Sequence, residues 1–277
     1  GCCYAQDNTA SDCTELEALE QWTMHPKVCD LDQSAMTQLT ELLVEHVTLS
    51  SCCNDVLVNT LKHCTQLKRL YLKDTDLQNC LLDLSNMTVL GELELHAITW
   101  SSSCCDELGR TLKHCTHLQT LTLNNTDLNN CELDLTNMTE LSKLELVNVV
   151  LSSSCCDILG RTLIHCTKLK DLNLQNTHLY NCELHLSNMT TLSYLTMEDV
   201  LLSKSASRVL EQSFDQLQSV KEDLCNYTVV CGVYSTVSST GMCVIDSNYN
   251  SVSVEYDDPY DYCSDYNSDS ESDSDFM

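Results

Sequence analysis

The chain has 277 residues and is strongly acidic, since 14 lysines and arginines stand against 41 aspartates and glutamates and give a formal net charge of −27. This charge argues against a nucleic-acid partner and against an anionic membrane surface, because both require a cationic face that displaces counterions. No apolar run approaches the roughly 18 residues of a membrane-spanning helix, so membrane insertion is not expected.

An internal repeat dominates the chain and has to be interpreted before any local motif. The frame L-x-x-L-x-L recurs at alternating steps of 23 and 28 residues, so the full period is 51 residues. The frames start at Leu16, Leu39, Leu67, Leu90, Leu118, Leu141, Leu169 and Leu192. Alternating leucines predict a short β-strand with one buried face in each frame. Residues 1–15 are expected to be a truncated repeat of a longer protein, because the chain begins with Gly inside a unit.

The two kinds of unit differ in how the chain returns to the next strand. In the 28-residue units, residues such as Cys104, Leu108, Leu112 and Cys115 have helical spacing, and Ser103 is the predicted N-cap. The 23-residue units contain Leu-Asp-Leu-Ser/Thr-Asn-Met-Thr, which predicts an extended or 3₁₀ return. Helices are therefore expected mainly on the 28-residue units.

The frames resemble the leucine-rich repeat family over residues 1–220. The pattern CxxLGRTLKHCTxLxxLxL is similar to the ribonuclease-inhibitor-like subclass, particularly to the C-terminal repeats of animal nucleotide-binding-domain/leucine-rich-repeat (NLR) receptors. The resemblance implies an α/β fold, a leucine-rich-repeat solenoid or horseshoe with a parallel concave sheet. It also implies a repeat region that recognises a ligand or holds a receptor inactive. The short units depart from the uniform helical repeats of that subclass.

One column of sulfur-containing residues lies three positions before each frame. It consists of Cys13, Met36, Cys64, Met87, Cys115, Met138, Cys166 and Met189, and Leu217 follows. Methionine cannot form a disulfide and is a poor zinc ligand, whereas both sulfur side chains pack as apolar groups when buried. We therefore predict that this column is part of the hydrophobic core.

A second column places one cysteine in each coil. Its members are Cys29, Cys53, Cys80, Cys104, Cys131, Cys155 and Cys182. Reduced, buried thiols are the first interpretation, and a reducing, cytoplasmic location fits it. Disulfides between neighbouring coils and adventitious metal are the alternatives. A zinc site at His114 and Cys115 is not expected, because consecutive residues of a helix diverge by about 100°.

Polar and apolar residues alternate eight positions after each frame start. The position holds threonine in the short units (Thr75, Thr126, Thr177) and valine or isoleucine in the long units (Val47, Ile98, Val149, Val200). Threonine donates and accepts hydrogen bonds, whereas valine and isoleucine do neither. We therefore expect a ladder of side-chain hydrogen bonds that is present in every second loop only.

The composition changes towards the C-terminus. Residues 203–220 have helical spacing and end the repeats, so the leucine-rich-repeat domain is expected over residues 1–221. Residues 222–256 alternate valine and tyrosine with serine and threonine, which predicts a small β cap or a poorly ordered β-like segment. Residues 257–277 contain many acids and no lysine or arginine, which predicts a disordered tail.

The candidate binding surface is the concave face, formed by the non-leucine positions of the strands, because solenoids expose alternate strand side chains in parallel. These positions are Lys68, Arg69, Tyr71, Lys73, Glu92, Glu94, His96, Thr120, Thr122, Asn124, Lys143, Glu145, Asp171, Asn173, Tyr194 and Thr196. The stretch 68–73 is a basic spot with one tyrosine in an acidic chain. An ordinary solvated strand face is the alternative. We predict neither an enzyme nor a cofactor, because the Cys-His pairs repeat in register and a catalytic site normally occurs once.

Three functional hypotheses follow. The first is a non-catalytic scaffold that binds a protein or another macromolecule on the concave face, as the sensing or autoregulatory region of an intracellular innate-immune-type receptor. The second is a secreted recognition protein with oxidised cysteines and glycosylated sequons. The third is an acidic, stand-alone inhibitor of a basic enzyme. Five N-glycosylation sequons occur, at Asn86, Asn124, Asn137, Asn188 and Asn226. We expect the three Asn-Met-Thr copies to lie at packed turns. The whole set is expected to be incidental unless the chain is secreted.

Overall fold

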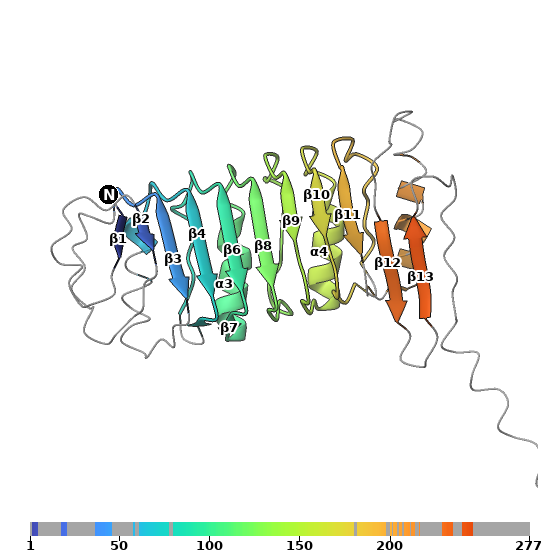
Figure 1. The fold of residues 1–277 in the computed structure, drawn as a ribbon, viewed down its shortest axis with the longest axis horizontal. Coiled ribbons are helices and arrows are strands. Elements are labelled where there is room, and N and C mark those ends of the chain that lie inside the picture. The colour runs from blue at the N-terminus through green and yellow to red at the C-terminus, as the bar shows by residue number, and fades with distance from the viewer. Residues whose placement is uncertain are drawn as a thin grey trace, which may run out of the picture.

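The dominant feature of the fold is one long, mostly parallel sheet. The computed structural model describes residues 2–4, 18–20, 37–45, 58, 61–77, 80–179, 182–197, 200, 202–203, 205–206, 208–210, 212–213, 216, 229–234 and 240–245. The strands of the sheet are β1 (Cys2–Tyr4), β2 (Ala18–Glu20), β3 (Glu41–Glu45), β4 (Arg69–Lys73), β6 (Glu92–His96), β8 (Thr120–Asn124), β9 (Lys143–Glu145), β10 (Asp171–Asn173), β11 (Tyr194–Met197), β12 (Val229–Tyr234) and β13 (Thr240–Ile245). Figure 1 shows these strands side by side in chain order.

Consecutive strands pair in parallel, one strand from each frame. Arg69 of β4 pairs with Glu92 of β6, and Glu92 pairs with Thr120 of β8, so these neighbours lie 23 and then 28 residues apart. The same pairing stacks Leu93 on Leu121 and continues through β9, β10 and β11. The predicted parallel sheet of an α/β fold is thus confirmed, whereas the horseshoe curvature stays a prediction. Two short strands, β5 (Asp76–Leu77) and β7 (Thr99–Trp100), form a second parallel pair at the strand ends.

The core lies on the leucine side of the sheet. Frame leucines such as Leu70, Leu93 and Leu121 are at most 1% exposed. The first sulfur column is equally buried, because Cys64, Met87, Cys115, Met138, Cys166 and Met189 are all 0% exposed. The prediction that this column is core is therefore confirmed for these six residues, while Cys13, Met36 and Leu217 lie outside the described residues.

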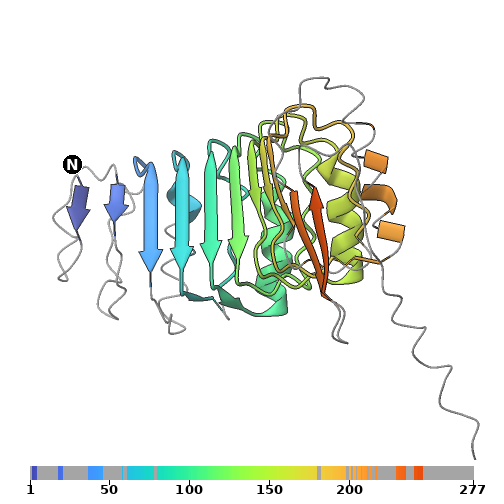
Figure 2. The same ribbon diagram turned by 45° about the vertical axis from the view of Figure 1, so that its right-hand side comes forward.

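Helices α3 (Ser102–Leu112) and α4 (Ser153–Leu163) belong to two 28-residue units and lie behind the sheet (Figures 1 and 2). The predicted N-cap Ser103 is wrong, because it is already inside the first turn of α3. The N-cap is Ser101, whose backbone is extended and whose hydroxyl accepts the backbone N–H of Cys104 at 3.4 Å. Ser152 caps α4 in the same way.

Each helix rests directly on the backbone of the next coil. A Cβ atom built on Gly109 of α3 would lie 2.8 Å from the backbone nitrogen of Glu132, closer than real Cβ contacts. Gly160 of α4 meets the backbone of Glu183 in the same way, one period later. The glycine of the LGRTL motif therefore permits close helix packing, in a place where any side chain would push the helix away.

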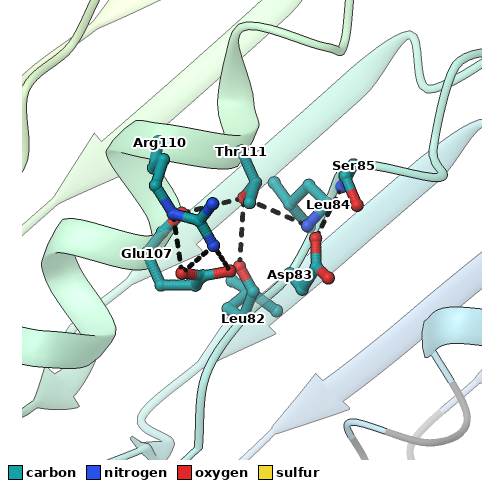
Figure 3. Close-up of polar contacts among 7 residues, drawn as sticks. All are labelled: Leu82, Asp83, Leu84, Ser85, Glu107, Arg110 and Thr111. Carbon is teal, nitrogen blue, oxygen red and sulfur yellow. Dashed lines mark hydrogen bonds and ion pairs between the residues drawn. The ribbon is translucent and has the colours of Figure 1, made fainter.

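Two rows of polar side chains tie the coils together. In the predicted loop ladder, the backbone N–H of Ile98 donates to Thr126 Oγ1 at 3.3 Å, and the threonine donates to the carbonyl of Asn124 at 2.9 Å. A second row was missed: Thr111, Thr162 and Ser213 lie on the helical side and bond to the backbone of the preceding short unit. Figure 3 shows Thr111 between Leu82 and Leu84, beside the exposed Glu107–Arg110 ion pair.

The residue seven positions after the frame start has a left-handed backbone in five described frames. Five turns contain such a residue with positive φ, namely Asp74, Ala97, Asn125, Asn148 and Asn176. Aspartate and asparagine tolerate this conformation better than other side chains do. Asn148 also donates through Nδ2 to Asn125 Oδ1 at 2.7 Å, whereas Ala97, at φ 51°, has only a methyl group.

The sheet continues beyond the repeats. Described residues 205–206, 208–210, 212–213 and 216 are helical. β12 then pairs in parallel with β11, and β13 pairs antiparallel with β12. The predicted division into 1–221, 222–256 and 257–277 stays a prediction, and residues 257–277 lie outside the described residues, as does most of the predicted truncated repeat at 1–15.

Candidate functional site

The candidate binding surface is the side of the sheet opposite the leucines, which we call the open face. The strands place alternate side chains there in register. Its described residues are Glu41, Leu43, Glu45, Arg69, Tyr71, Lys73, Glu92, Glu94, His96, Thr120, Thr122, Asn124, Lys143, Glu145, Asp171, Asn173, Tyr194 and Thr196. Lys68 is the one predicted residue outside the strands; it directly precedes β4 and is exposed.

Three residues of the open face were missed in the sequence. Glu41, Leu43 and Glu45 lie on β3, opposite Arg69, Tyr71 and Lys73 of β4. The sequence pattern that would have identified them is the frame that starts at Leu39, because it has the same alternation as the later frames. With β3 included, the open face gains two carboxylates and becomes more acidic.

Arg69 of the predicted basic spot is not a free positive charge. Arg69 Nε lies 2.7 Å from Glu92 Oε2, and Arg69 Nη1 lies 3.5 Å from Glu41 Oε1. The charge of Glu92, followed by that of Glu41, raises the pKa of Arg69. Arg69 is paired because the two neighbouring strands, 23 and 28 residues away in the sequence, place a carboxylate on either side of its guanidinium group.

A hollow of about 340 Å³ opens beside this cluster, between β3, β4 and β6. Its lining is Glu41, Leu42, Leu43, Arg69, Leu70, Tyr71, Glu92 and Glu94. Burial raises the pKa of the Tyr71 phenol, and the charges of Glu45, Glu94 and Asp74 raise it further. The ring of Tyr71 lies 5.2 Å from that of His96, centroid to centroid. The hollow therefore combines an aromatic wall with a negative potential.

Two side chains at the centre of the open face are buried rather than exposed to solvent. Thr122 and Asn124 are only 3% and 7% exposed, which contradicts their prediction as accessible binding residues. Asn124 donates to Glu145 Oε1 at 2.6 Å and accepts the backbone N–H of Val147 at 3.0 Å, so its side chain joins two coils. Asn124 is also one of the sequons, and its burial leaves no room for a glycan.

Glu145 is held in its charged form by its neighbours. Burial by itself would raise the pKa of this carboxyl, but hydrogen bonds from Asn124 and from Lys143, at 3.0 Å, lower it overall. The next strand behaves differently: burial raises the pKa of Asp171, and the charge of Glu145 adds to the effect. Further along, Tyr194 is 63% exposed and offers an open aromatic ring.

The open face is acidic overall. It carries six carboxylates, those of Glu41, Glu45, Glu92, Glu94, Glu145 and Asp171, against three cations, those of Arg69, Lys73 and Lys143. Among the residues that the structure describes, no group of three or more His, Cys, Asp or Glu side chains could hold a metal ion. In the same part of the chain, no helix has the length and apolar character needed to cross a bilayer.

Comparisons with known proteins do not identify a family for this chain. No protein-family model matches the chain, and no curated protein matches its sequence. A leucine-rich-repeat protein of Leptospira interrogans is similar in structure, with 12% identity over 82% of this chain and 79% of that chain, and a TM-score of 0.39. The internalin InlF of Listeria monocytogenes has 17% identity, covers 77% and 78%, and has a TM-score of 0.25.

The functional domain of InlJ, also from Listeria monocytogenes and described as including a cysteine ladder, has 15% identity, covers 70% of this chain and 62% of that chain, and has a TM-score of 0.23. Scores of this size carry no argument about what this chain binds. The repeat architecture rests instead on the chain's own sheet, in which L-x-x-L-x-L frames supply successive parallel strands in register.

Proposed function

We propose that this chain is a non-catalytic, protein-binding scaffold whose partner lies on the open face and presents basic side chains to it. The observation that carries the proposal is the contrast between the two sides of the sheet. The buried side repeats leucine in every coil, whereas the open side changes from coil to coil and carries twice as many carboxylates as cations. A variable, acidic surface on a rigid repeat is suited to recognition by charge and shape.

The hollow beside Tyr71 is the expected centre of that interaction. Tyrosine and arginine dominate the energetics of protein interfaces, and an aromatic ring under a negative potential favours a cation. Arg69 would form the rim, because its own charge is already balanced by Glu41 and Glu92. Tyr194 extends the surface towards the C-terminal end.

To test this proposal, peptides that bind the chain are selected from a displayed library of random peptides. The affinity of the selected peptides is then measured for the wild-type chain and for two variants. Glu94→Gln removes a carboxylate from the hollow. Glu132→Gln removes the same charge from an exposed position on the helical side, so it controls for net charge. We expect the selected peptides to be rich in lysine and arginine, and to lose about tenfold in affinity, or about 1.4 kcal/mol, with Glu94→Gln only. Equal losses in both variants would show that only the overall charge matters.

At a finer level, we propose that the scaffold is the sensing or autoregulatory region of an intracellular, cytoplasmic innate-immune-type receptor of the ribonuclease-inhibitor-like subclass. The resemblance of CxxLGRTLKHCTxLxxLxL supports it. The test is a count of reactive thiols after denaturation without reductant. Nearly all of the 20 cysteines should react in the intracellular case.

One observation favours the secreted alternative. The sequon residues Asn86, Asn137 and Asn188 are exposed, which corrects the expectation of packed turns. They occupy the same place in three successive short units, where a glycan would meet solvent. Expression through a secretory pathway would show added mass at these three residues and few reactive thiols. The third hypothesis, an inhibitor of a basic enzyme, predicts binding that weakens steeply with salt.

A further inference from the structure

The two cysteines of the doublet at the start of α4 contact different neighbouring coils. Cys155 Sγ donates to the carbonyl of Asn129, in the preceding coil, at 3.3 Å. Cys156 Sγ lies 4.0 Å from the carbonyl of His178, in the following coil. Cys105 repeats this forward contact one period earlier, at 3.6 Å from the carbonyl of Asp127. The divergence follows from the angle of about 100° between consecutive helical residues.

Cys156 and Cys105, the thiols that contact the following coil, each have a cysteine of that coil nearby. Cys182 Sγ donates to the carbonyl oxygen of Cys156 at 3.2 Å, which places the Cys182 thiol beside Cys156, and the interaction between the two thiols raises the pKa of Cys182. Cys105 Sγ reaches the coil that carries Cys131 through its contact with Asp127, and a hydrogen bond from Cys105 raises the pKa of Cys131. Members of both pairs are 26 residues apart, and the pairs are related by the period of 51 residues. All four side chains are at most 2% exposed.

We propose that Cys105–Cys131 and Cys156–Cys182 are two disulfide-forming thiol pairs whose substrate is a small-molecule disulfide such as oxidised glutathione. Neighbouring coils of a parallel sheet are about 4.8 Å apart, which lies within the Cα separations of about 4.4–6.8 Å that disulfides span. Cys64, Cys115 and Cys166 differ, because they recur only in every second coil, roughly 10 Å apart.

The chemistry is thiol–disulfide exchange, and Cys156 is the expected first nucleophile of its pair. Its thiolate attacks one sulfur of the glutathione disulfide, and the departing glutathione thiolate takes up the proton that Cys156 lost. Cys182 then gives up its proton and attacks Cys156 Sγ, which releases the second glutathione as a thiol. The hydrogen bond from Cys182 lowers the pKa of Cys156, and the same contact raises the pKa of Cys182.

Solvent reaches this part of the molecule. An opening of about 380 Å³ lies between the first turns of α3 and α4. Its lining is Ser102, Ser103, Asp106, Asn129, Asn130, Glu132, Ser154 and Cys155. Asn130 and Glu132 are the two chain neighbours of Cys131, so the opening lies beside the Cys105–Cys131 pair. Each disulfide would fasten a helix to the coil after it and restrict the unfolded chain, which raises the melting temperature.

The test uses the full, reduced chain, equilibrated in buffers whose ratio of reduced to oxidised glutathione is varied stepwise. N-ethylmaleimide then blocks the remaining thiols, and the digest is analysed by mass spectrometry without reduction. We expect two linked peptides at the oxidising end, with four fewer blocked thiols in the described repeats and a higher melting temperature. Fragmentation should place the bonds at Cys105 and Cys156 rather than at Cys104 and Cys155.

The cysteine doublet supplies a matched control. Cys156→Ala should abolish the bond to Cys182 and leave Cys105–Cys131 intact, whereas Cys155→Ala should leave both bonds. If an alanine variant does not fold, the fragmentation of the wild-type peptides answers the same question. The proposal is overturned if the folded, oxidised chain yields only mixed disulfides with glutathione, if the bonds run through Cys104 or Cys155, or if a chain in guanidinium gives the same bonds in the same yield.

Discussion

Thr111 on α3 accepts a hydrogen bond from the backbone N–H of Leu84, 27 residues earlier in the sequence, at 3.1 Å. The same hydroxyl donates to the carbonyl of Glu107 at 2.9 Å and lies 3.4 Å from that of Leu82. Thr162 makes the equivalent contacts to Leu133 and Leu135 one period later. A short unit without a helix thus has its backbone groups satisfied by the helix of the next long unit.

Thr111→Val tests that relationship. Valine has nearly the same shape but no hydroxyl, so the buried N–H of Leu84 loses its partner. We expect a loss of about 1–3 kcal/mol in the free energy of unfolding, measured by urea denaturation. Thr116→Val, at an exposed threonine just beyond α3, should change it by less than about 0.5 kcal/mol. Equal effects from the two substitutions would contradict the role of Thr111.

Gly109→Ala tests the contact between α3 and the next coil. In an exposed helix this change would stabilise the protein by about 1 kcal/mol. Here the new Cβ would lie 2.8 Å from the backbone nitrogen of Glu132, so we expect a loss of about 1–3 kcal/mol in thermal or urea unfolding. Gly91→Ala is the control, because its Cβ would meet only Lys68 O at 3.7 Å. A stabilised Gly109→Ala protein would refute the close packing.

Ala97→Asn should stabilise the protein. Ala97 is held at φ 51°, a conformation that costs most residues roughly 1 kcal/mol and that asparagine tolerates. Asn125 and Asn148 occupy the same turn position and bond to each other, so an asparagine at 97 would extend that row. We expect a gain of about 0.5–1 kcal/mol, and a comparable loss for Asn148→Ala. Both are read from the urea midpoint, and a destabilised Ala97→Asn would count against the idea.

The first cysteine column should make the protein sensitive to alkali. Burial raises the pKa of Cys64, Cys115 and Cys166 from 9.0 to about 12. Between these values the unfolded chain releases a proton that the folded chain keeps, so the stability present below pH 9 falls as the pH rises. The expected slope is about 1.4 kcal/mol per pH unit for each thiol.

Cys115→Ala isolates the contribution of one thiol. The variant will be less stable at neutral pH, because it leaves a cavity in the core. Its stability should nevertheless fall less steeply than that of the wild type between pH 9 and pH 11, in urea titrations under reducing conditions. Parallel curves for the two proteins would mean that Cys115 does not titrate differently in the folded and unfolded states.

The buried side of the sheet could be predicted in detail from the sequence. Leu93 and Leu121 repeat with the period of two that a half-buried strand imposes, and the repeat places Met87 and Cys115 in equivalent positions. The open-face residues followed from the same alternation. Accessibility did not, because Thr122 and Asn124 have the pattern of exposed residues and are covered by neighbours from other coils.

The recurring features could be predicted from the order of the residues: the strands, the core columns and the alternating units, together with the acidic charge. These features depend on the spacing of residue types along the chain, and in a periodic chain that spacing is visible in the sequence. The contacts between one coil and the next could be read only from the folded chain, as with Arg69 between Glu41 and Glu92, or Cys182 Sγ against the carbonyl of Cys156. The physical reason is that such contacts depend on how one coil is offset against its neighbour, and that offset is set by packing between residues far apart in sequence.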